Sequence, residues 1–191
     1  MKKIISIVLA VALIFALAVT AMAAEIADCT VSADSVSATA GGTVTVPIRI
    51  SGNRGFTNFG IALDYDREQL ELLSIQTAEG ETPYLCGTTV AVNTQWTGTD
   101  EKTFGYVTAA LEEAATADGI LFTATFRVSG DFSGTAAVQP VVQYMRSNKR
   151  LLSVFDAIPV TTVSGTVSTV LVGDYDQNGT VNALDVMGLY R

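Results

Sequence analysis

Strict alternation of apolar and polar residues over short segments is the feature that most constrains the fold of this chain. The segments 44–50, 59–65 and 122–128 alternate in this way, and each is bordered by Gly, Asn or Asp. A period of two places every second side chain on the same face of a β-strand. Half of each segment must therefore face a core, which predicts an all-β domain.

The strand pattern extends over residues 26–170. Further short strands are predicted at 88–93, 103–111, 136–142 and 161–170, with turn-rich stretches between them. Many short strands at this spacing are typical of an antiparallel β-sandwich. Two segments are compatible with helix: about two turns over 67–73, after Asp66, and a final segment at 183–190.

The first residues have the composition of a secretory signal peptide. Lys2 and Lys3 precede a nearly unbroken apolar run at 4–19, and the small residues that follow suit cleavage after Ala23. The alternative is a retained membrane anchor, for which this run is short, since a span needs about 20 residues. We therefore predict a leader at 1–23, an exported protein and no membrane contact after cleavage.

Charge and composition exclude several classes of function. The full chain carries a net charge of −8, and removal of two lysines with the leader makes it −10. An acidic surface of this kind disfavours nucleic acid as a partner. There is no histidine, the commonest general base and zinc ligand. Cys29 and Cys86 are too few for a disulfide scaffold, and they either pair or remain free.

A segment rich in oxygen ligands follows the strand pattern. With Asp174 as position 1, a glycine falls at position 6, where a tight calcium loop needs unusual backbone angles. Oxygen donors occupy the ligand positions of an EF-hand-type loop. They are Asp174, Asp176, Asn178, the Thr180 carbonyl, Asn182 and Asp185. The spacing predicts a Ca²⁺ site followed by a helix.

The loop has two other interpretations. A polar Asp/Asn/Gly turn on the surface of an exported protein needs no metal. Magnesium prefers a rigid octahedron and keeps several waters, so it fits a loop with this many protein oxygens less well than calcium.

Residues 174–191 resemble the first calcium-binding segment of a dockerin, in which the loop ends in Asp and a helix follows. The resemblance implies that loop positions 10 and 11, here Ala183 and Leu184, help to select a partner cohesin. Dockerins carry two such segments, whereas one precedes Arg191, so the resemblance is to a truncated dockerin. Either the sequence is a fragment of a longer product or the module is degenerate.

The preceding region resembles a cohesin, the receptor domain of cellulosome scaffolds. The matching stretches are 55–66, 70–73 and 118–126, in that order. The resemblance implies a nine-stranded jelly-roll sandwich in which one flat sheet face docks a dockerin helix. It divides the chain into a leader at 1–23, a cohesin-like sandwich at 24–170 and a partial dockerin-like segment at 171–191.

Possible contact positions come from the first of these stretches. Asn58 stands where cohesins often place a polar contact residue, and Gly60 replaces a side chain that frequently makes another contact. Ala62 shares their face because its position has the same parity, and the intervening apolar residues should point into the core. The alternative for Asn58 is an ordinary solvated strand residue.

Other residues offer weaker signals. Trp96 and Tyr106 are candidate platforms for sugar rings, although isolated aromatic residues in a sandwich more often belong to the core or an edge. Glu112 and Glu113 are adjacent on a predicted strand and so point to opposite faces. They cannot form the facing pair of carboxylates that glycoside hydrolysis needs.

These observations predict a non-catalytic extracellular or cell-surface adaptor. The sandwich would bind dockerins of glycoside hydrolases or scaffold proteins, and the calcium-binding end would bind a second cohesin. The alternative is a carbohydrate-binding or adhesion module, with polysaccharide as the ligand.

Overall fold

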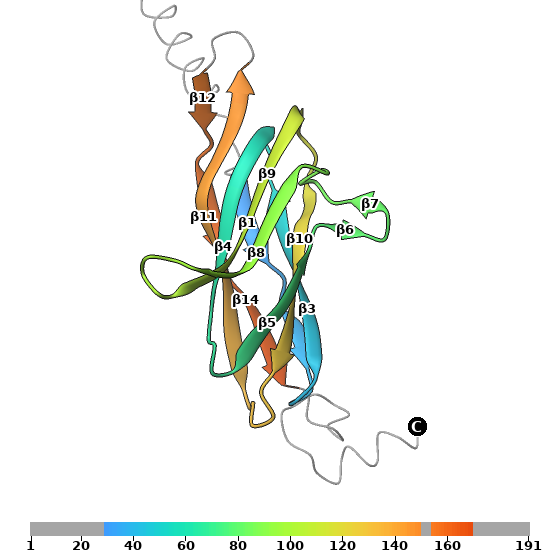
Figure 1. The fold of residues 1–191 in the computed structure, drawn as a ribbon, viewed down its shortest axis with the longest axis vertical. Coiled ribbons are helices and arrows are strands. Elements are labelled where there is room, and N and C mark those ends of the chain that lie inside the picture. Colours follow the sequence, from blue (N-terminus) through green and yellow to red (C-terminus); the bar gives the residue numbers. More distant parts are fainter. Residues whose placement is uncertain (1–28, 150–153, 170–191) are drawn as a thin grey trace, which may run out of the picture.

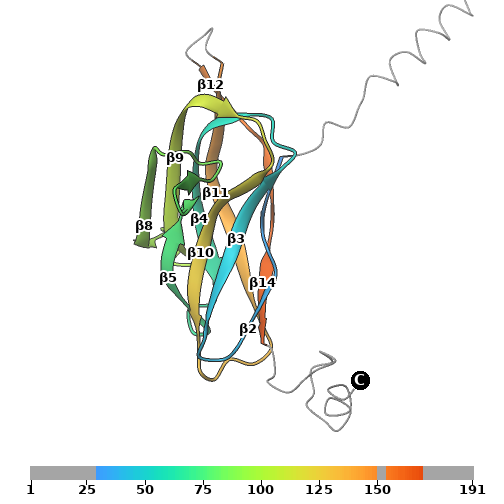
Figure 2. The ribbon, with the colours of Figure 1, turned by 90° about the vertical axis from the view of Figure 1, so that its right-hand side faces the viewer.

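The alternating segments form strands of two sheets that face each other (Figures 1 and 2). The structure is a computed structural model, and it describes residues 29–149 and 154–169. Every regular element in these ranges is a strand. The all-β sandwich predicted from the sequence is therefore confirmed.

The first sheet has five strands in the order β13-β1-β3-β10-β5. All neighbours are antiparallel except β1 and β13. The strands are β1 (Cys29–Ala33), β3 (Thr43–Ser51), β5 (Leu70–Gln76), β10 (Gly119–Val128) and β13 (Val160–Val163).

The second sheet has the order β2-β14-β11-β4-β9-β8, and β12 pairs with β11. Its strands are β2 (Val36–Ala38), β4 (Phe56–Tyr65), β8 (Val90–Thr97), β9 (Thr103–Ala115), β11 (Thr135–Lys149), β12 (Val154–Ala157) and β14 (Gly165–Thr169). A small hairpin, β6 (Ala78–Glu79) with β7 (Thr82–Pro83), projects from the side of the sandwich (Figure 1).

The strands near both ends of the described chain cross between the sheets. β1 lies in the first sheet and β2 in the second, and the same holds for β13 and β14. If each pair counts as one strand that changes sheet, and the short β6, β7 and β12 are set aside, nine strands remain. The structure itself has fourteen strands in the described ranges, so the nine-stranded jelly roll implied by the cohesin resemblance remains a prediction.

The core lies between the sheets and follows the alternation of the sequence. In β3 the buried residues are Val44, Val46, Ile48 and Ile50, while the residues between them are partly or fully exposed. The largest aromatic side chains of the core come from both sheets, and each is completely buried: Phe56, Phe59, Phe122 and Phe126.

The segment 67–73, which is compatible with helix from its sequence, does not form a helix. The Leu70 amide donates to the Asp66 carbonyl over 2.9 Å, so a single helical turn does form after Asp66. From Leu70 onward, however, the chain is strand β5, paired with β10. Leu70 lies opposite Val128 and Leu72 opposite Phe126, so cross-strand pairing overrides the local helical preference.

Several predictions concern residues outside the described ranges. They are the leader at 1–23, the calcium loop at 174–185 and the helix at 183–190. Within the described ranges, no helix is long and apolar enough to span a bilayer.

The core predicts a large loss of stability when Phe126 is truncated. Its ring packs edge-on against Tyr65, with the ring centroids 4.9 Å apart. Because Phe→Ala removes buried area and leaves a cavity, Phe126→Ala should lower the free energy of unfolding by about 3–5 kcal/mol. Chemical denaturation measures this loss. The control is Arg127→Ala, the exposed neighbour, which should cost about 1 kcal/mol or less; equal losses would contradict the assigned core.

Candidate docking face

The outer face of the second sheet contains the contact positions predicted from the sequence. They lie on β4, which pairs with β9 on one side and β11 on the other. The residues that alternate with them, Phe59, Ile61 and Leu63, are at most 1% exposed and belong to the core, as predicted. Asn58, Gly60 and Ala62 therefore point away from the core, toward the outer face.

Two tyrosines from the neighbouring strands meet over Gly60. A Cβ atom at residue 60 would overlap the hydroxyl oxygen of Tyr106, which comes from β9, and would lie 2.6 Å from Cε1 of Tyr144, which comes from β11. Both distances are shorter than normal van der Waals contact. The absence of a side chain at Gly60 is thus what allows the two tyrosines to cross the sheet.

The tyrosine hydroxyls belong to a small hydrogen-bond network. Tyr144 and Thr108 have their hydroxyl oxygens 2.7 Å apart, and Tyr106 shares a side-chain hydrogen bond with Tyr144. Burial, followed by this hydrogen bond, raises the pKa of Tyr106 to about 12. A tyrosine is uncharged at neutral pH even at its ordinary pKa of about 10, and the shift moves its ionisation further from neutral pH. The centre of the face is therefore polar but uncharged.

An aromatic row extends from this centre toward both sides. Trp96, in β8, stacks on Tyr106 with a centroid separation of 5.2 Å and an interplanar angle of 33°. On the other side, the guanidinium carbon of Arg146 lies 5.2 Å from the centroid of the Tyr144 ring, within the range of a cation–π contact. We call Trp96, Tyr106 and Tyr144 the aromatic belt. It crosses the sheet from β8 to β11.

The three predicted contact positions differ in accessibility. Asn58 is partly buried, and its Oδ1 atom has no hydrogen-bond partner among the described residues. Gly60 lies beneath the tyrosines, and Ala62 is completely buried beside Tyr106 in the strand register. A partner that approaches this part of the face would therefore meet the aromatic belt before it met Gly60 or Ala62.

The sequence alone indicates no role for Tyr144 and Arg146, and it offers Trp96 and Tyr106 only as candidate sugar platforms. The signal for their proximity was a glycine in a central strand with tyrosines in two other strands. It can be interpreted only when β4 is known to lie between β9 and β11, an order that the sequence does not give.

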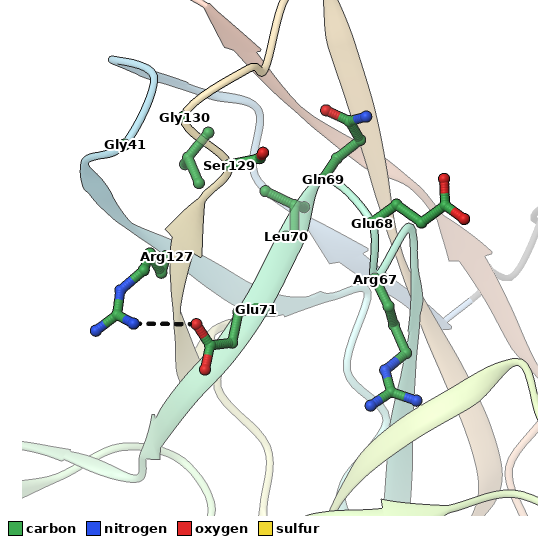
Figure 3. A pocket seen from close by; sticks show the side chains of 10 residues that line it. Gly41, Arg67, Glu68, Gln69, Leu70, Glu71, Arg127, Ser129 and Gly130 are labelled. Atoms are coloured by element: carbon green, nitrogen blue, oxygen red, sulfur yellow. Dashed lines mark hydrogen bonds and ion pairs between the residues drawn. The ribbon is translucent and has the colours of Figure 1, made fainter.

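A shallow pocket at one end of the first sheet contains an ion pair (Figure 3). Arg127 Nη1 and Glu71 Oε2 are 3.2 Å apart there, and both side chains are more than half exposed. An exposed pair of this kind is a common surface feature and contributes little energy. Nothing about this pocket indicates a specific ligand.

The described residues offer few groups for catalysis or metal binding. Cys29 and Cys86 are buried and unbonded, and burial raises the pKa of Cys86 to about 11, which makes it a poor nucleophile. Across 29–149 and 154–169, no group of three or more acidic or cysteine side chains is arranged to hold a metal. The predicted ligands Asp174, Asp176, Asn178, Thr180, Asn182 and Asp185, and the recognition pair Ala183 and Leu184, lie outside these ranges.

Comparison with known proteins gives one family. The family model described as "Cohesin domain" matches residues 29–169. Among solved structures, the seventh ScaB type I cohesin from Pseudobacteroides cellulosolvens is 20% identical, with a TM-score of 0.59, and the match covers 75% of this chain and 94% of that one. No match was found among curated proteins.

Two further structures have the same fold. A non-cellulosomal cohesin from the archaeon Archaeoglobus fulgidus is 20% identical, with a TM-score of 0.58, over 78% of this chain and 96% of its own. A chain of the Coh-OlpA–Doc918 cohesin–dockerin complex from Clostridium thermocellum is 17% identical, with a TM-score of 0.58, over 75% and 99%. At such identities these likenesses establish a shared sandwich fold.

The contact over Gly60 predicts that Gly60→Ala disturbs the aromatic belt. The added methyl group must displace Tyr106 and Tyr144, and overpacking of this kind costs about 1–3 kcal/mol. Trp96 is the one tryptophan of the chain, so its fluorescence and near-UV circular dichroism report on its stacking with Tyr106. Both signals should change.

The matched control for this variant is Gly130→Ala, because a Cβ atom at residue 130 meets no atom within 4 Å. Gly130→Ala should leave the Trp96 signals unchanged. An unchanged spectrum and unfolding temperature in Gly60→Ala would show that the tyrosines do not meet over this glycine.

Proposed function

The chain belongs to the cohesin family, and on this basis we propose that it is an adaptor whose second sheet captures dockerin-bearing proteins. Cohesin domains are non-catalytic protein–protein interaction modules, so the prediction that the chain is not an enzyme is confirmed. Some of the similar structures are described as cohesin–dockerin complexes. The partners proposed here are dockerins attached to glycoside hydrolases or to other scaffold proteins.

The aromatic belt is the observation that supports this proposal best. Tyr and Trp are enriched among the residues that dominate binding energy at protein interfaces, because they bury a large area with few rotatable bonds. The belt lies on paired strands, and its side chains are held by stacking and hydrogen bonds. A helix could lie across it with little rearrangement of the receptor.

The proposed location and the role of the C-terminal end rest on the sequence. Export by the leader at 1–23 would bring the adaptor to the extracellular space or the cell surface. Asp174, Asp176, Asn178 and Asp185, with Thr180 and Asn182, would hold Ca²⁺ through hard oxygen ligands. The dockerin-like segment around Ala183 and Leu184 would then bind a second cohesin.

The belt predicts tight binding of at least one dockerin and its loss on truncation of Tyr144. Intact dockerins, including those of the similar complexes, would be titrated by calorimetry into residues 24–191, with calcium and with a chelator. A one-to-one, calcium-dependent complex is expected. Tyr144→Ala should weaken it by about tenfold or more, because a buried interface tyrosine contributes about 2 kcal/mol or more.

The control for this experiment is Tyr84→Ala. Tyr84 is partly buried beside the projecting hairpin and lines a pocket together with residues of the first sheet. Tyr84→Ala should bind as wild type does. Equal weakening by both variants would remove the second sheet as the binding face. If no dockerin of the panel bound, and the chain were retained on insoluble polysaccharide, the result would instead support the carbohydrate-binding alternative.

The calcium loop predicts metal binding that depends on its first ligands. Asp174→Ala combined with Asp176→Ala removes two of the predicted carboxylate ligands. This double variant should abolish Ca²⁺ binding in the micromolar range, measured by calorimetry on residues 24–191. Asp131→Ala combined with Asp118→Ala is the matched control, with the same charge change within the sandwich. Equal Ca²⁺ binding by wild type and by the loop variant would contradict the assignment.

A further inference from the structure

The outer face of the second sheet around the aromatic belt, which we call the docking face, has an uneven distribution of charge. In the strands β4, β8, β9 and β11, the positively charged residues are Arg146 and Lys149, both in β11. The acidic residues of these strands are Asp64, Glu112 and Glu113, and β12, which pairs with β11 beside Arg146, contains Asp156. Since the whole chain has 19 acidic and 11 basic residues, a cation beside the aromatic belt contrasts with its surroundings.

Arg146 is accessible and held in place. Its side chain is exposed, and its guanidinium lies against the Tyr144 ring. Among the residues whose side chains are described, 29–147 and 157–169, no carboxylate lies within ion-pair distance of it, whereas Arg49 and Arg127 pair with Asp34 and Glu71. Stacking on an aromatic ring restricts the guanidinium, so an incoming carboxylate would order it at a smaller entropic cost.

The position of Arg146 relative to the belt is fixed by strand register. Arg146 lies opposite Asn58, and Tyr144 lies opposite Gly60 on the same pair of strands. Arg146 is thus two residues along β11 from Tyr144, beside the place where Tyr106 and Tyr144 meet. Asp64, at the other end of β4, is six residues from Asn58, or about 20 Å along the strand.

We infer that this face selects a dockerin helix that places an acidic side chain opposite Arg146 and small side chains where it crosses the contact between Tyr106 and Tyr144. This inference rests on the proposed function and specifies the chemistry of the partner. The tyrosines stand above Gly60 and fill the space that a large partner side chain would need. The uncharged centre leaves Arg146 as the cation of the belt, and it fixes the orientation of the helix.

A displayed library tests the chemistry of the partner directly. The exposed helix positions of one intact dockerin that binds the wild-type chain would be randomised. The library would then be selected in parallel, with calcium, against wild type and against Arg146→Glu. Asp or Glu should be enriched at one helix position with wild type, and Lys or Arg at the same position with Arg146→Glu. Gly, Ala or Ser should be enriched nearby with both.

The selected pairs would then be measured by calorimetry. Arg146→Gln should weaken the wild-type complex by about tenfold, and this weakening should shrink at high salt. Arg127→Gln, which removes the same charge from the other sheet, should change affinity by less than about twofold.

The outcomes distinguish failure of this inference from failure of the proposed function. Identical residues selected by wild type and Arg146→Glu, or equal effects of Arg146→Gln and Arg127→Gln, would overturn the inference while leaving dockerin capture intact. Failure of the wild-type chain to bind any dockerin of the panel would overturn both.

Discussion

The side chains of β4 are buried on both faces of the second sheet, and this double burial joins the core to the docking face. On the inner face, Phe59 and Ile61 are completely buried among the aromatic residues of the core. On the outer face, Gly60 and Ala62 are covered by the side chains of the flanking strands. A change in the position of β4 would therefore disturb both the packing between the sheets and the alignment of the aromatic belt.

The rest of the topology holds β4 in the middle of its sheet. β9 and β11 pair with it over most of their length, and β11 is secured in turn by β14 and β12. The strands near the two ends of the described chain cross between the sheets and pair in parallel, β1 with β13 and β2 with β14. These crossings fasten the two sheets along one side. A binding surface on such strands is more rigid than one made by loops.

The sequence was sufficient to predict properties that depend on local pattern. Alternation identified the strands that contain Ile48, Ile61 and Phe126, and parity correctly divided β4 into inward and outward residues. Prediction failed at 67–73, because the pairing of Leu70 with Val128 in a distant strand outweighs a local turn. The aromatic belt could not be predicted from the sequence, because neither the order of the strands nor their register can be derived from one strand alone.

In the proposed function, affinity and selection would therefore depend on different physical terms within one face. The belt is uncharged because it consists of Trp and Tyr side chains, which are neutral at neutral pH, so its proposed contribution is the burial of aromatic area. That term favours many helices about equally. Arg146 adds a term that depends on the direction of the helix and on the charge it carries, within a chain whose overall negative charge repels acidic partners at a distance. The two terms meet at Tyr144, whose ring packs over Gly60 and also supports the guanidinium of Arg146. The glycine in the central strand thus affects both terms, since it allows the tyrosine to hold the position from which the arginine meets its partner.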